Sequence, residues 1–428
     1  MSLPSRSANQ ILSVPGECQG HGLWGQSSNR SRGGGGRMWR GLGAAFLCVA
    51  LATGAQGAKQ KKPKETVLYD FTGAGDGAYP EAGLIQDAQG NFYGTTHNGG
   101  TANLGSVFKL AAGGVESVLH SFTGGSDGEY PFGGLLLDAH GNLYGTTPNG
   151  GGTGCGGVGC GIVYEITAAG TEVVLYRFLG LPDGAYPFDT LVMDSQGNLY
   201  GTASGGGQKN WGSVFEITQS GTEKTLYSFT GGADGGLPIG GVIFGTDGNL
   251  YGTTQSGGVA GCSFGQGCGV VFEVAPAGGE SLLYTFSGGT DGGSPYGGLV
   301  RDGDGNFYGT TLLGGSANLG TVFQLTTGGK ETVLHSFGGL DGATPEAGLI
   351  LDAKGNLFGT TFAGGTHKKG TLFEVAANGT ESVLYNFGGK HGYNPQCALV
   401  QDAAGNFYGT TVVGGTHKFG TVFELVVP

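Results

Sequence analysis

Short hydrophobic segments alternate with glycine-rich turns along most of the chain. The string G-N-(F/L)-(Y/F)-G-T occurs seven times at nearly constant spacing, beginning at Gly90, Gly141, Gly197, Gly248, Gly305, Gly355 and Gly405. A period of about 50 residues indicates a repeat architecture in which each unit buries its apolar face against its neighbours.

Three other strings recur in step with the first. E-x-V-L-Y-x-F occupies 65–71, 116–122, 172–178, 223–229, 280–286, 331–337 and 381–387. G-(T/S)-V-F-E-(L/I/V) occupies 105–110, 161–166, 212–217, 269–274, 320–325, 370–375 and 420–425. G-L-(I/L/V)-x-D begins near Gly83 and Gly134 in the first two units. Their β-branched and aromatic residues, flanked by Gly, Pro or Asp, predict strands. Four strands in each of seven units predict an all-β, seven-bladed β-propeller, because a β-helix would have a far shorter period.

The order of the strings also predicts how the ring closes. With G-L-I-x-D as the inner strand and E-x-V-L-Y-x-F as the outer one, the last unit lacks its outer strand. Residues 65–71, at the start of the repeat region, supply the missing string. We therefore predict that 65–71 pairs with the strand near 420–425, which removes two open sheet edges.

Two kinds of loop are predicted to share one face of the disc. One is the D-G-x-x-P loop before the inner strand, first seen at 76–80, and the other follows the G-T-T string at 99–101. The D-x-x-G-N turns, such as 87–91, lie on the opposite face, and Gly90 suits the positive φ of a hairpin turn. Since ligand sites gather at the mouths of such rings, the first face is the candidate binding face.

The segment 1–57 does not carry the repeat. We interpret 1–37 as a non-globular extension, 38–57 as a signal peptide, 58–64 as a linker and 65–428 as the propeller. Residues 38–57 combine Arg40, an apolar run of about 13 residues and small residues near Ala55, which is typical of a signal peptide. The run is too short to span a membrane. We expect a secreted or periplasmic protein without a C-terminal anchor.

Composition narrows the function classes. The chain of 428 residues has 97 Gly, but only 12% charged and 10% aromatic residues, which favours a folded chain over a disordered one. Its formal net charge is −12, and removal of residues 1–57, with five arginines and one glutamate, would make it −16. Such a surface repels nucleic acid and anionic membranes. No G-x-S-x-G, H-E-x-x-H or phosphate-loop motif is present.

The repeat D-A-x-G-N-L-Y-G-T-T-x-x-G-G…G-T-V-F-E-L…G-T-E-x-V-L-Y-x-F…D-G-x-x-P, read over 65–428, resembles the GloVer tandem repeat of secreted bacterial proteins. The resemblance implies export and a propeller-like fold, but it assigns no biochemical activity. The D-x-x-G-N turn also resembles the NHL type of propeller repeat, which implies the same strand order.

Cysteines interrupt two of the loops. Four residues separate Cys155 from Cys160 and five separate Cys262 from Cys268, so the pairs lie at or beyond the upper limit of the C-x₂₋₄-C spacing typical of zinc, which also takes four ligands. In a secreted chain we expect two local disulfides. Cys397 replaces a small residue at the start of an inner strand, and we expect a buried, inert thiol that lines the channel.

Function is expected where the seven copies differ. The ligand-binding candidates are His367, Lys368, Lys369, His417, Lys418, His391, Trp211 and Asp189. The histidines and lysines would form a basic patch for an anionic ligand, and Trp211 offers a flat apolar face for a sugar ring. Solvated loop charge and packing of Trp211 beneath a loop are the alternatives. Asp189 is expected to line the channel.

The recurring aspartates of the D-G-x-x-P loops admit two interpretations. They are Asp76, Asp127, Asp183, Asp234, Asp291 and Asp341, with His391 in the seventh copy. They either form a cation-binding ring or organise their own turns, and the second is favoured. His120 and His335 replace a tyrosine and are expected to be half-buried.

These patterns predict a non-catalytic binding or scaffold module for a carbohydrate or protein ligand. We expect a monomer without cofactor, metal, nucleic-acid partner or membrane span. The alternative is a carbohydrate-active lyase or hydrolase with its site at the channel mouth. An enzyme would show an acid or base with a perturbed pKa there, near Asp189 or His391.

Overall fold

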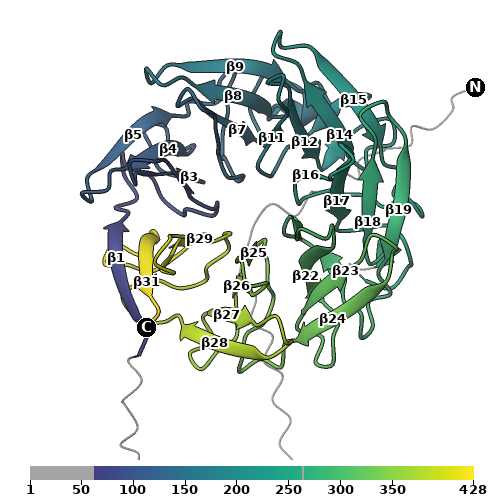
Figure 1. The fold of residues 1–428 in the computed structure, drawn as a ribbon. Coiled ribbons are helices and arrows are strands. Elements are labelled where there is room, and N and C mark those ends of the chain that lie inside the picture. The colour runs from purple at the N-terminus through teal and green to yellow at the C-terminus, as the bar shows by residue number, and fades with distance from the viewer. Residues whose placement is uncertain (1–61, 263–264) are drawn as a thin grey trace, which may run out of the picture. The chain divides into compact units, whose positions relative to one another are not determined.

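The computed structural model describes residues 62–262 and 265–428, and this part of the chain is all-β. Seven four-stranded antiparallel sheets surround a central channel, which confirms the seven-bladed propeller (Figure 1). The proposed extension and signal peptide lie outside the described residues. Within the described ranges we find no helix with the length and apolar character needed to cross a bilayer.

Each blade runs from a two-residue inner strand to a six- or seven-residue outer strand. The fifth blade has an additional short strand, β20 (Gly293–Pro295), which pairs with its second strand. Blades 1 to 4 are β2 (Ile85–Gln86), β3 (Phe92–Thr96), β4 (Ser106–Leu110), β5 (Glu116–Ser121); β6 (Leu136–Leu137), β7 (Leu143–Thr147), β8 (Ile162–Ile166), β9 (Glu172–Arg177); β11 (Val192–Met193), β12 (Leu199–Ala203), β14 (Ser213–Ile217), β15 (Glu223–Ser228); and β16 (Ile243–Phe244), β17 (Leu250–Thr254), β18 (Val270–Val274), β19 (Glu280–Thr285).

The remaining blades follow the same order. Blades 5 to 7 are β21 (Val300–Arg301), β22 (Phe307–Leu313), β23 (Thr321–Leu325), β24 (Glu331–Ser336); β25 (Ile350–Leu351), β26 (Leu357–Thr361), β27 (Thr371–Val375), β28 (Glu381–Asn386); and β29 (Val400–Gln401), β30 (Phe407–Thr411), β31 (Thr421–Val426), β1 (Lys64–Asp70). In addition, β10 (Gly184–Ala185) pairs β13 (Gly205–Gly206), β20 (Gly293–Pro295) adds to β22, and η1 (Cys155–Gly157) is a 3-10 turn.

The ring closes as the strand order predicts. Strand β1 pairs antiparallel with β31, from Lys64 opposite Val426 to Asp70 opposite Thr421. Figure 1 shows the purple β1 beside the yellow β31. The outer edge of β31, the last strand of the chain, is therefore covered by the first strand.

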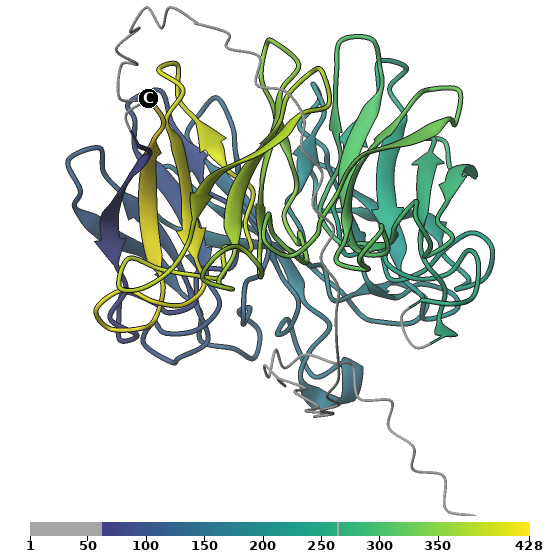
Figure 2. The ribbon, with the colours of Figure 1, turned by 90° about the horizontal axis from the view of Figure 1, so that it is seen from below.

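The two kinds of loop do share one face, which we call the loop face. Ala78 and Asn98 exchange backbone hydrogen bonds of 2.8 and 3.0 Å, joining the two loops of blade 1. Tyr79 N donates to Phe419 O of blade 7, so this loop also ties its blade to the preceding one. Figure 2 shows the ring edge-on, with the C-terminal end of β31 on the opposite, upper face and long loops gathered below.

Aromatic side chains fill the space between blades. In every junction a phenylalanine just after an outer strand meets an aromatic ring on the third strand of the next blade, edge to face, with centroids 5.0 to 5.2 Å apart. Phe71 and Phe108, one such pair, are fully buried. A Cβ on Gly94 would lie 2.7 Å from Phe108 Cζ, so the glycine of G-N-L-Y-G-T leaves room for this ring.

The cysteine prediction is confirmed. Cys155 bonds to Cys160, and Cys262 bonds to Cys268, each pair lying within one loop between the second and third strands of a blade. Among the described cysteines Cys397 is free and buried.

Each disulfide closes a small loop and is expected to stabilise the protein by about 2 kcal/mol. The variant C155S/C160S should therefore lower the midpoint of thermal unfolding by a few degrees and leave the far-UV circular dichroism unchanged. Treatment of the wild type with a thiol reductant should give a similar or larger decrease. A reduced protein as stable as the oxidised one would contradict this estimate.

Candidate functional site

The mouth of the channel on the loop face is lined by one residue from each blade. In every copy the chain passes through a residue in the left-handed region, with φ of 50 to 58°, and then a proline. The next side chain reaches the channel, and these seven are Glu81, Phe132, Phe188, Ile239, Tyr296, Glu346 and Gln396. We call this set the mouth ring. It is aromatic or aliphatic in four blades and carries a carboxyl or amide group in three.

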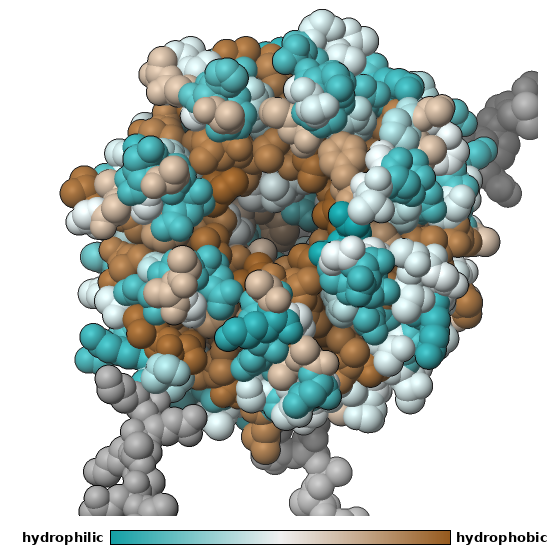
Figure 3. All heavy atoms as spheres, in the orientation of Figure 1, coloured by the Kyte–Doolittle hydropathy of each residue, from teal (hydrophilic) through white to brown (hydrophobic). Residues whose placement is uncertain are grey.

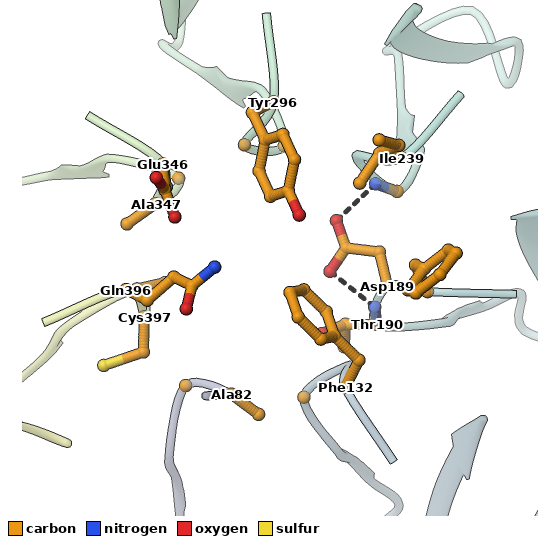
Figure 4. Close-up of a pocket in the computed structure, with 18 of the residues that line it drawn as sticks. Ala82, Phe132, Asp189, Thr190, Ile239, Tyr296, Glu346, Ala347, Gln396 and Cys397 are labelled. Carbon is orange, nitrogen blue, oxygen red and sulfur yellow. Dashed lines mark hydrogen bonds between the residues drawn. The ribbon is translucent and has the colours of Figure 1, made fainter. Parts of the chain in front are cut away.

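The mouth ring and the inner strands enclose a cavity of about 360 Å³. Figure 4 looks into it and shows Tyr296, Phe132, Asp189 and Gln396 directed toward a common space. Phe132 and Phe188 pack edge to face, with centroids 5.5 Å apart. Figure 3 shows the opposite face of the molecule, which carries the C-terminus. The centre of that face is also hollowed and surrounded by hydrophobic residues. The cavity combines an apolar wall with a few polar groups, which is the usual composition of a small-molecule site.

Two glutamates of the mouth ring ionise with difficulty. Burial, together with the nearby Glu346 carboxyl, raises the pKa of Glu81 to about 8. Burial raises the pKa of Glu346 to about 7. A solvated glutamate has a pKa of about 4.3, so both groups hold protons at a pH where surface glutamates are charged. At neutral pH Glu81 can therefore donate a hydrogen bond as well as accept one.

The Gln396 side chain is mostly buried, but its amide is open to the cavity. The residue is 8% exposed, its amide makes no hydrogen bond within the described ranges, and neither amide atom is among the fully buried atoms that lack a partner. A bound molecule or water in the cavity can therefore complete the hydrogen bonding of this amide. Figure 4 shows this amide directed into the cavity.

Asp189 lies in the channel wall, as its position at an inner strand predicts. Its carboxylate accepts hydrogen bonds from the backbone N of Thr190, at 2.6 Å, and of Gly241 in the next blade. Burial raises the pKa of Asp189, although these hydrogen bonds oppose the shift. Whether Asp189 also contacts a ligand stays a prediction.

His97 stands beside the mouth ring. Its Nδ1 lies 3.3 Å from Glu81 Oε2, and its ring stacks on Tyr130 at 5.2 Å between centroids. Burial lowers the pKa of His97 to about 4, which keeps the imidazole neutral. His97 does not stand out in the sequence, because the same position holds Pro148, Ser204 or Gln255 in the next copies and follows no motif.

Cys397 also lines the channel but is held by the backbone. Thr410 N lies 3.2 Å from its Sγ, and burial raises the pKa of the thiol. Both features favour an inert thiol, as expected.

The histidines and lysines of the predicted basic patch lie in loops of blades 6 and 7. His391 Nδ1 lies 3.1 Å from Glu65 Oε2, and His417 Nδ1 lies 3.8 Å from Asp70 Oδ1. Lys369 Nζ sits 3.8 Å from the centre of the Tyr393 ring. At least half of the patch thus has partners within the fold.

Lys368 and Lys418 occupy a special backbone position. Both adopt a positive φ, of 59° and 72°. Three other blades use an asparagine there, and its side chain accepts a hydrogen bond from a loop glycine, as Asn103 Oδ1 does from Gly99 N. Asparagine is therefore a natural replacement for either lysine.

Trp211 packs beneath the next loop, which is the alternative considered for it. A Cβ on Gly231 or Gly236 would lie within 3 Å of the indole, and Trp211 borders a buried cluster that contains Phe229. Leu104 and Phe419 hold the same position in other blades.

The loop aspartates organise their own turns. Asp76 accepts hydrogen bonds from Thr72 N, Thr72 Oγ1 and Tyr69 OH, at 2.6 to 3.0 Å. Burial opposes ionisation of Asp76, but these hydrogen bonds outweigh it and lower the pKa. The other loop aspartates that accept a hydrogen bond from the backbone of their own turns are Asp127, Asp183, Asp234, Asp291 and Asp341.

The model of the Gloeobacter/Verrucomicrobia repeat matches residues 58–158, 153–353 and 260–427. The chain belongs to this family. The match confirms the resemblance inferred from the repeat strings and covers nearly all of the propeller.

Solved structures share the propeller fold at low identity. A fungal alcohol oxidase of the AA5 family in complex with copper is 12% identical, with a TM-score of 0.54, over 86% of this chain and 76% of that one. A gluconolactonase from Xanthomonas campestris is 14% identical, with a TM-score of 0.44, over 86% and 90%. An extracellular domain from B. thetaiotaomicron is 12% identical, with a TM-score of 0.49, over 83% and 39%. At these identities the likeness shows the fold alone. No curated protein sequence matches the chain.

Proposed function

We propose that this protein is a binding module that holds a small, neutral, hydroxyl-rich molecule, such as a terminal sugar residue, in the mouth ring. The Gln396 amide, which is directed into the cavity and makes no hydrogen bond among the described residues, carries the proposal. Residues that maintain the fold recur in each blade, whereas the mouth ring uses five residue types in seven blades, so the fold does not dictate the identity of these residues.

The lining suits a sugar in three respects. Phe132, Phe188 and Tyr296 offer aromatic surface for the C–H faces of a pyranose ring. Gln396 and the two glutamates offer hydrogen bonds to hydroxyl groups. Because the pKa values of Glu81 and Glu346 are raised to about 8 and 7, these two groups carry less negative charge near neutral pH than solvated glutamates would, which suits a neutral ligand.

We also propose that the protein acts outside the cytoplasm. Two disulfides within single loops suit an oxidising compartment. The segment 38–57, with its apolar run and small residues, supports export.

The binding proposal predicts the effect of exchanging mouth-ring residues between blades. Gln396→Ile installs the residue that blade 4 uses at this position and should weaken binding of a neutral saccharide at least tenfold, because the buried hydrogen bonds are lost. A panel of neutral mono- and disaccharides, screened by saturation-transfer NMR and titrated by calorimetry, measures it.

The control is K368N/K418N, which removes two charges from the basic patch and introduces the asparagine of other blades. Its affinity for the neutral saccharide should be unchanged. The mouth-ring site would be contradicted if the wild type bound none of the saccharides in the panel. It would also be contradicted if binding were lost in K368N/K418N and kept in Gln396→Ile.

A hydrolase is the second candidate, and the raised pKa of Glu81 favours it. A carboxyl that keeps its proton near neutral pH can act as a general acid. Chromatography of a bound oligosaccharide after incubation distinguishes the two. Hydrolysis would be established if the wild type formed cleavage products and Glu81→Gln did not. If the wild type left the oligosaccharide intact, the protein would be a binding module.

A further inference from the structure

Each blade junction carries the same kind of side-chain cluster on the rim. The first member is the tyrosine or histidine of E-x-V-L-Y-x-F, the second is the loop residue that follows it, an aspartate in six junctions, and the third is the glutamate that begins the outer strand of the next blade. Tyr69, Asp76 and Glu116 form the first cluster, with Tyr69 OH 3.0 Å from Asp76 Oδ2 and 3.4 Å from Glu116 Oε2. Five junctions use tyrosine and two use histidine, His120 and His335.

The histidine of one junction brings three metal-ligating groups together. His335 on β24, Asp341 in the following loop and Glu381 on β28 each offer a ligand atom, and these atoms lie within 4.8 Å of one another. His335 Nε2 is 2.9 Å from Asp341 Oδ2. Glu381 Oε1 is buried and has no hydrogen-bond partner among the described residues. No other group of this kind occurs in the described ranges.

The second histidine junction provides an internal comparison. Asp127 accepts hydrogen bonds from both Thr123 N and Thr123 Oγ1, besides lying 3.2 Å from His120 Nε2. The loop before Asp341 is one residue shorter than the loop before Asp127. It begins with Gly338 in place of Thr123, and glycine has no hydroxyl group. Within the described ranges Asp341 therefore accepts only from Gly338 N and His335, which leaves lone pairs on its carboxylate for another partner.

We propose that His335, Asp341 and Glu381 bind a divalent transition-metal ion, Zn²⁺ in the first instance. One imidazole and two carboxylates suit this ion, with water completing the coordination. The ion would take the place of the hydrogen bond between His335 Nε2 and Asp341 Oδ2, with the proton of the neutral imidazole carried by the other ring nitrogen. Its positive charge would offset the negative charges of the two adjacent carboxylates. Since His335 belongs to blade 5 and Glu381 to blade 6, the ion joins two blades.

Calorimetric titration of EDTA-treated, dialysed protein with ZnCl₂ tests the proposal. We expect one saturable site. His335→Tyr, which installs the residue of five other junctions and so preserves the fold, should weaken binding at least tenfold. Glu381→Gln, of the same size without the charge, should also weaken it. His120→Tyr should leave the affinity unchanged, because the second histidine junction is not part of the site.

Proton release gives an independent readout. Because the ligands bind Zn²⁺ in their deprotonated forms, the affinity should fall as pH is lowered from about 7.5 to about 5.5. At the acidic end, where binding releases protons from the ligands, the apparent enthalpy should depend on the ionisation enthalpy of the buffer. The proposal is overturned if the wild type shows no saturable site. Equal binding by wild type and His335→Tyr would overturn it too, since exposed histidines such as His367 would then explain the titration.

Discussion

Deletion of strand β1 is expected to abolish cooperative folding of the ring. A chain that starts after Phe71 lacks the strand that covers β31 and lacks the fully buried Phe71 ring. Loss of one buried phenylalanine alone costs about 3 to 5 kcal/mol, out of the roughly 5 to 15 kcal/mol by which a typical domain is stable. The six residue pairs between β1 and β31 are lost in addition. Thermal unfolding followed by circular dichroism should show a broad transition or none.

A chain that starts at Lys59 is the matched control and should unfold like the full chain. A synthetic peptide of residues 62–72, added to the shortened protein, should restore a cooperative transition, because the strand acts through non-covalent pairing. A shortened chain as stable as the control would show that β1 is not required for closure.

Stability is expected to fall as pH rises from about 5 to about 8. Partial burial, with Asp234 and Asp291 nearby, raises the pKa values of Glu280 and Glu331 to about 7. A carboxyl whose pKa is higher in the folded state binds its proton more tightly there. Its stabilising contribution is therefore present below about pH 4.5 and is lost as pH rises to about 7. Since solvent screens these half-buried groups, we expect roughly 1 kcal/mol for each.

The double variant E280Q/E331Q separates the pH dependence caused by the rim glutamates from that caused by the glutamates of the channel. Glutamine keeps the size and some of the hydrogen bonding without the charge, so the variant should be more stable than wild type at pH 8 and similar at pH 5. Part of the pH dependence should remain, since Glu81 and Glu346 titrate in the same direction. E374Q, on β27 outside the junctions, should leave the pH dependence unchanged. An unfolding midpoint that is constant or rises from pH 5 to 8 would contradict the assignment.

Repetition is the reason that the fold could be predicted from the sequence, because each structural requirement recurs seven times. The strand order, the shared loop face and the pairing of β1 with β31 all follow from the register of four strings. Disulfides could be predicted because the cysteines interrupt that register in pairs. The junction clusters could be predicted from the sequence only in part. The turn role of Asp76 was expected, but Glu116, on the next outer strand, joins it only through the arrangement that brings successive outer strands together.

The mouth ring could not be predicted from local patterns. Its members lie one repeat apart and have no side-chain type common to all seven. Only the alignment of the seven prolines, from Pro80 onward, reveals them as one set. Asp189 and Cys397 were detected because they replace small residues. The basic patch shows the opposite situation, and its role in ligand binding stays a prediction. Its lysines and histidines are neighbours in sequence, whereas the acids that face them, Glu65 and Asp70, come from the distant N-terminal strand.

The junction between blades 6 and 7, which includes the N-terminal strand β1, differs from the other junctions in its electrostatics. Where six junctions place an aspartate near the outer-strand glutamate, this one places His391 beside Glu65, and Tyr385 OH donates to the same carboxylate at 2.6 Å. In those six junctions the glutamate lies on an outer strand that the chain connects to the third strand of the same blade. Glu65 instead lies on β1, which is held to β31 by pairing and not by a connecting turn. His391 and Tyr385 therefore add polar contacts to the one outer strand that non-covalent interactions alone keep beside the third strand of its blade.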